Sequence, residues 1–166
     1  MRYRTMMVVA AALGAGLLFA QAPAQAPPAA DLNQLMRGLF FPHSNVIFET
    51  QRQDPAKIKR HPEPSSASDP LTGIFGGWDA VENSALTLIE GSDLLMRTGR
   101  SCSNGVDAPV EKADWAKMVE DLRQAGRVAL KAAQSRSIDA MFEASDVLNT
   151  ACSNCHNRYR RANRCQ

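Results

Sequence analysis

The sequence predicts an all-α domain, and three observations lead to that prediction. Apolar residues recur every three or four positions over four stretches, at about 32–53, 78–96, 110–134 and 137–161. That spacing places them on one face of a helix. No stretch shows the alternation of apolar and polar residues that is typical of strands. Every proline except Pro42 lies outside the four stretches, where proline acts as a break.

The first 24 residues predict an export signal that is not part of this domain. Arg2 and Arg4 form a positive start, and Met6 to Ala20 is an apolar run of 15 residues. Ala22-Pro23-Ala24 has the spacing of a cleavage site, so we expect cleavage before Gln25. An uncleaved anchor is the alternative, but 15 residues are fewer than the ~20 that span a bilayer. Export predicts an oxidising compartment, in a bacterium the periplasm, and no membrane span after cleavage.

The charge balance and the residue types exclude two classes of function. Without Arg2 and Arg4, the basic residues equal the 17 acidic ones in number, and no long basic run remains. Nucleic acid is therefore not an expected partner. No pair of a nucleophile and a base, and no pair of carboxylates, stands out. The sequence therefore does not predict an enzyme.

The first predicted helix covers about 32–53. Asp31 is its expected N-cap, and Asp54-Pro55 is its expected end. Its apolar residues follow helical spacing: Leu32, Leu35, Met36, Leu39, Phe40, Val46 and Ile47. Pro42 removes a backbone hydrogen bond and presses on the Gly38 carbonyl, so we expect a kink near 38–42. Residues 25–30, ahead of this helix, are rich in Ala and Pro and predict a flexible leader.

The second predicted helix covers about 78–96 and follows a long connection. Residues 54–70 hold four prolines and predict a surface loop. Its basic residues Lys57, Lys59 and Arg60 are expected to be solvated, with a docking patch for a partner protein as the alternative. The helix has one broad apolar stripe: Trp78, Val81, Ala85, Leu88, Ile89, Ser92 and Leu95. Gly99 follows its end, as glycine often does.

The last two predicted helices cover about 110–134 and 137–161. The stripe of the first is Trp115, Met118, Val119, Leu122, Gly126, Ala129 and Ala133. Its small residues would let either a flat ligand or a neighbouring helix approach closely. The stripe of the second, which Ser137 is expected to cap, is Ile138, Met141, Ser145, Leu148, Cys152, His156 and Tyr159. The link between the two helices is short, so we expect antiparallel neighbours.

A motif near the end of the last helix carries the chemistry. Cys152-Ser-Asn-Cys155-His156 has the form C-x-x-C-H, which is the attachment signature of a c-type haem. On a helix its Cys and His residues stand at i, i+3 and i+4 and project from one face. Cys152 and Cys155 would each bond one vinyl group of the porphyrin, and His156 would be the proximal ligand of the iron.

Two other uses of a C-x-x-C sequence must be weighed against haem. A redox dithiol is expected near a βαβ pattern, and no strand pattern surrounds the motif. A zinc site requires a second pair of ligands, and Cys102 and Cys165 are not spaced as a pair. Haem attachment is the prediction, and zinc is the remaining alternative.

The motif and its context resemble the class II c-type cytochromes, the cytochrome c′ family. Residues 152–160, Cys-Ser-Asn-Cys-His-Asn-Arg-Tyr-Arg, are similar to the family's C-x-x-C-H-x-x-Y-R ending. Residues 35–42, Leu-Met-Arg-Gly-Leu-Phe-Phe-Pro, and 45–48, Asn-Val-Ile-Phe, are similar to the first helix of its low-spin subgroup. The resemblance covers about 31–161.

The resemblance implies an antiparallel up-down-up-down four-helix bundle over 31–166, with one covalent haem c near the C-terminal end of the last helix. It implies a periplasmic carrier of single electrons between redox partner proteins. Met36 is then the candidate sixth iron ligand, with simple core packing as the alternative. Without that ligand the iron would be five-coordinate and open to small gases such as NO or CO. Family members often dimerise, so a second copy is a further candidate partner.

Three more residues belong to the predicted site or its surroundings. Arg160 lies four residues after His156 and would place positive charge near the haem, with an ordinary solvated arginine as the alternative. Cys102 and Cys165 remain after haem attachment and are expected to form a disulfide in an oxidising compartment. Closing that loop would contribute roughly 4 kcal/mol. Free thiols, or pairing between chains through Cys165, are the alternatives.

Overall fold

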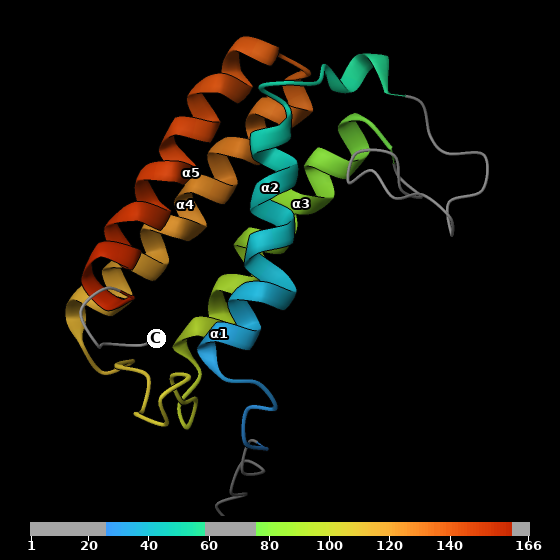
Figure 1. Cartoon of the computed structure of the whole chain (residues 1–166). Helices are drawn as coiled ribbons and strands as arrows, with labels where there is room; N and C mark the ends of the chain where they lie inside the picture. The colour runs from blue at the N-terminus through green and yellow to red at the C-terminus, as the bar shows by residue number, and fades with distance from the viewer. Residues whose placement is uncertain (1–25, 59–75, 161–166) are drawn as a thin grey trace, which may run out of the picture.

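The computed structural model describes residues 26–58 and 76–160, and this part of the chain is mostly helical with no strand. Its helices in chain order are α1 Leu32–Leu35, η1 Met36–Phe40, α2 Phe41–Glu49, η2 Pro55–Lys57, α3 Trp78–Gly91, η4 Ser92–Met96, α4 Ala113–Ser135 and α5 Ile138–Tyr159. Figure 1 shows the long helices running alongside one another. The predicted all-α class is confirmed.

The first helical run, from α1 through η1 to α2, begins as predicted and has an irregular middle. Asp31 and Gln34 form a capping box, each side chain bonding the backbone N–H of the other. The segment η1 is a π-helix, and the Phe41 N–H donates to the Met36 carbonyl five residues back. Pro42 has no N–H for the Gly38 carbonyl, so the α-helical pattern cannot continue through this segment.

The ends of the helices differ from the predicted ends by a few residues. The Thr50 hydroxyl donates to the Ile47 carbonyl across 2.7 Å, and α2 ends at Glu49 instead of 53. Lys112 N bonds the Pro109 carbonyl in a turn, so α4 begins at Ala113 instead of 110. The N-cap of α5 is Ser137, as predicted, and its hydroxyl accepts from Ala140 N at 3.2 Å.

Contacts between helices bury a shared core, with Ile47, Leu88, Met141 and Leu148 fully buried. The pair α2 and α3 is joined by a hydrogen bond of 3.2 Å between His43 Nδ1 and Ser84 Oγ. The pair α2 and α5 is joined by Ser145 Oγ, which donates to the Ile47 carbonyl at 3.5 Å. Only Arg136 and Ser137 separate α4 from α5, and Figure 1 shows this pair packed along its length.

The part of the predicted leader that the structure describes lies against the loop after η4. Arg97 donates to the Ala26 carbonyl, and the buried Arg100 donates to the Ala30 carbonyl. The predicted export signal, residues 1–24, lies outside the described residues. None of the described helices is both long enough and apolar enough to cross a membrane.

Candidate functional site

The predicted motif occupies the last two turns of α5. Cys152, Cys155 and His156 are half-buried, and both cysteines pack against the hydrophobic core. Because they stand at i, i+3 and i+4 of one regular helix, all three lie on the same face. The helix therefore brings two sulfur atoms and an imidazole together without help from a distant part of the chain.

Both cysteines carry free thiols, and their surroundings keep these thiols protonated. Burial raises the pKa of Cys152. Burial, followed by the neighbouring Cys152, raises the pKa of Cys155 to about 11. Reactive dithiols have lowered pKa values instead. This pair is therefore poorly suited to reversible disulfide exchange.

The end of α5 is held by a cluster of side chains that sequence reasoning missed. The Tyr159 hydroxyl donates to Asp114 Oδ1 at 2.6 Å, and Arg158 Nε donates to Asp114 Oδ2 at 3.0 Å. The Tyr159 ring meets the Trp115 ring edge-on, with centroids 5.0 Å apart. Tyr159 and Trp115 were predicted to face the core, but no sequence signal pairs Asp114 with a residue 45 positions away.

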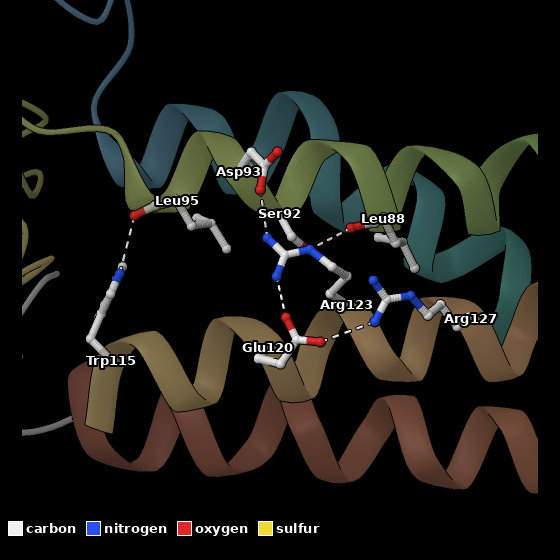
Figure 2. Close-up of polar contacts among 8 residues, drawn as sticks. All are labelled: Leu88, Ser92, Asp93, Leu95, Trp115, Glu120, Arg123 and Arg127. Carbon is white, nitrogen blue, oxygen red and sulfur yellow. Dashed lines mark hydrogen bonds and ion pairs between the residues drawn. The ribbon is translucent and has the colours of Figure 1, made fainter. Parts of the chain in front are cut away.

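The partners of Asp114 change the pKa of its carboxyl group. Its pKa is lowered, first by the hydrogen bond from Tyr159 and then by Arg158. The pKa of Tyr159 is raised by burial and by the neighbouring carboxylate. The Trp115 indole completes the cluster by donating to the Leu95 carbonyl at 3.1 Å (Figure 2). The cluster thus links α5 to α4 and α4 to η4.

Met36, the candidate sixth ligand, lies in another helical run. It is half-buried in the π-helical segment η1 and packs against the core. Figure 1 shows the start of this run, in blue, at the same end of the molecule as the C-terminal turns of α5, in red. Residues of π-helical turns are frequently found at functional sites. This position agrees with both uses of Met36, so iron ligation stays a prediction.

The small residues of α4 serve helix packing. A methyl group added at Gly126 would lie 2.9 Å from Ile89 Cγ1 and 3.3 Å from the Ala85 carbonyl oxygen of α3. Ala129 and Ala133, on the same stripe, are fully buried. Of the two explanations left open by the sequence, a neighbouring helix is therefore correct for Gly126, and a flat ligand has no room there.

The remaining predicted residues are placed as follows. Arg160 is exposed just beyond α5, and its N–H donates to the His156 carbonyl at 3.0 Å. Cys102 is buried and disulfide-bonded. Its predicted partner Cys165 lies outside the described residues, so that pairing stays a prediction. Lys59 and Arg60 of the basic cluster also lie outside them.

A surface pocket of about 470 Å³ lies between α4 and α5, close to the motif. Its lining includes Met118 and Asp121 from α4 and Asn154 and Asn157 from α5. Neither cysteine of the motif lines it, nor does His156. Within residues 26–58 and 76–160, no three His, Cys, Asp or Glu side chains are grouped as metal ligands. This pocket therefore touches the motif only through Asn154.

The residues at the end of α5 fit a covalently bound haem. Both thiols are free, as thioether formation requires. They are half-buried beside core residues, so a haem on this face would contact apolar side chains on one side. His156 follows Cys155 directly and could ligate the iron of the same group.

Comparisons with known proteins returned no match: no family model, no curated protein and no solved structure is significantly similar to this chain. The resemblance to class II c-type cytochromes therefore rests on the residues quoted for it and stays a prediction.

Proposed function

We propose that this protein is an exported class II c-type cytochrome that carries single electrons. One haem c would be bound through thioethers to Cys152 and Cys155, with His156 as proximal ligand. The observation that carries the proposal is the set of two free, protonated thiols and an imidazole on one half-buried face of α5. The haem, when bound, supplies the one-electron chemistry, and the helices hold it rigidly and limit its contact with water.

The helical arrangement supports this proposal. Pairwise contacts join α2 to α3, α3 to α4, α4 to α5 and α5 to α2. Four helices that contact one another in this cyclic order agree with an antiparallel up-down-up-down bundle. Such a bundle places a cofactor between facing helices, and here the first helical run would face the haem-bearing end of α5.

Electron transfer is proposed over gas binding because residues 35–42 and 45–48 resemble the first helix of the low-spin subgroup, which makes Met36 the candidate sixth ligand. The thioether of Met36 is half-buried in a helical segment at the same end of the molecule as the motif. A Met/His pair would close the iron to external ligands and suit a carrier that passes electrons between redox proteins. If Met36 only packs in the core, the five-coordinate iron would bind small gases such as NO or CO.

The decisive experiment is production of the full chain in bacteria that attach haem to exported c-type cytochromes. We expect haem absorption that stays with the polypeptide after denaturation. The double variant C152S/C155S should lose it, whereas Ser153→Ala, between the two cysteines, is the matched control and should keep it. A wild-type protein with no covalent haem, or with bound zinc instead, would overturn the proposal.

A further inference from the structure

The haem motif reaches, through His156, into the part of α5 that is most prone to fray. The last four carbonyl groups of a helix have no partner within it, and helix ends open at little cost in free energy. Here α5 ends at Tyr159, so His156 begins the last four residues. The His156 carbonyl accepts from Arg160 N at 3.0 Å, which is a single backbone bond at the end of α5. Side-chain contacts of this turn would add to that bond in keeping the imidazole in one orientation.

Tyr159 supplies such contacts through both its ring and its hydroxyl. The ring is 6% exposed and packs edge-on against Trp115, which is 3% exposed. The hydroxyl donates to Asp114 at 2.6 Å, a short hydrogen bond to a charged acceptor. Asp114 lies in the first turn of α4, where the N–H groups of the helix favour a carboxylate. Trp115 and Asp114, which hold the ring and the hydroxyl of Tyr159, therefore both belong to the start of α4.

We propose that Tyr159 is a positioning residue of the haem site, which fixes the orientation of His156 through its hydrogen bond to Asp114. Tyr159 stands three residues after His156, so the two side chains are neighbours on the surface of α5. A rotation or opening of the last turn would move both together. The ring contact limits the distance between α5 and α4, and the hydrogen bond limits the rotation of α5 about its own axis.

This inference rests on the proposed function and predicts a consequence that stability alone would not give. The orientation and basicity of an axial histidine tune the potential of the iron. Loss of the Tyr159 hydroxyl should therefore change the midpoint potential. The ring and its packing remain in Tyr159→Phe, so the variant is expected to fold.

The test compares three variants of the full haem-loaded chain: Tyr159→Phe, Asp114→Asn and the double variant. Asp121→Asn is the matched control, because it removes one carboxylate from the same helix, and Asp121 bonds Lys117 instead of α5. We expect the midpoint potential to shift in the same direction in both single variants. The shift should be smaller in Asp114→Asn, because its amide oxygen still accepts a weaker hydrogen bond from Tyr159, and the double variant should shift no further than Tyr159→Phe. Amides of residues 157–160 should exchange faster, on the order of tenfold. The control should leave both measurements close to those of the wild type.

Two other results would overturn the positioning role of Tyr159, and a third would overturn both proposals. Equal shifts in Asp114→Asn and Asp121→Asn, with none in Tyr159→Phe, would mean that charge alone acts and would overturn the positioning role. Faster exchange with an unchanged potential would make Tyr159 merely structural and would also overturn it, leaving the proposed function intact. A wild-type chain without covalent haem would overturn both proposals.

Discussion

Gly126 of α4 lies directly against Ile89 of α3, and an added methyl group at Gly126 would come within 2.9 Å of Ile89 Cγ1. The same methyl group would lie 3.3 Å from the Ala85 carbonyl oxygen, which is backbone and cannot turn away. Glycine at this position therefore sets how closely the two helices approach. Just beyond the end of α3, Arg123 of α4 also bonds Asp93 of η4 at the surface (Figure 2).

Gly126→Val should destabilise the fold by about 1–3 kcal/mol, because its branched side chain forces α3 and α4 apart. The measurement is the free energy of unfolding from urea titration. Gly38→Ala is the matched control, since a methyl group there meets no atom within 4 Å. That variant should be as stable as the wild type or more stable. Equal losses in both variants would contradict the close packing at Gly126.

Trp115→Ala should cost about 3–5 kcal/mol of unfolding free energy, since the buried indole packs in the core and bonds the Leu95 carbonyl. Trp115→Phe keeps an aromatic ring against Tyr159 and loses the indole N–H, so its loss should be much smaller. Urea titration of both variants measures the difference. A loss below about 1 kcal/mol for Trp115→Ala would show that the cluster contributes little to the fold.

Much of the helical structure could be predicted because its signals are local. Asp31 and Ser137 cap the helices that they were expected to cap, and the motif lies on the predicted face of α5. The ends of helices are harder to predict, because a single side chain can compete with a backbone N–H for hydrogen bonding to a carbonyl group. Ser92 illustrates this: its hydroxyl donates to the Leu88 carbonyl at 2.6 Å where α3 gives way to the 3-10 helix η4.

The long-range part of the site could not be predicted. Periodicity places Trp115 and Tyr159 on buried faces, but it does not say which residues of two helices lie at the same level. The short link between α4 and α5 sets how far one helix is shifted along the other. This shift brings Asp114 opposite Tyr159. The π-helical turn at Met36 could not be predicted either, and it changes which residues of the first helical run face inward. The C-x-x-C-H motif is thus readable from the sequence, whereas the side chains that support it and the partners of Met36 are not.

The stability of the protein should fall in acid through Asp114. Its pKa in the folded protein is lowered by Tyr159 and Arg158, so the unfolded chain takes up the proton at higher pH. The contribution of Asp114 is therefore complete above its ordinary pKa of 3.8 and is lost as the pH falls through the lower folded value. Urea midpoints measured from pH 6 to pH 2 should show the wild type and Asp114→Asn converging. Asp121→Asn should keep the wild-type profile, and parallel profiles of wild type and Asp114→Asn would contradict the assignment.

Met36→Ala decides between the two uses of the proposed haem. If Met36 ligates the iron, its removal leaves a five-coordinate site, so the ferrous spectrum should change from low-spin to high-spin and CO should bind readily. The weak ferric band that arises from sulfur ligation should disappear as well. Leu39→Ala is the matched control, because Leu39 is another half-buried apolar residue of η1 and has no iron-binding atom. The control should lose stability and keep the wild-type spectrum. If the spectrum of Met36→Ala is also unchanged, Met36 only packs in the core, and CO binding by the wild type would then favour gas binding over electron transfer.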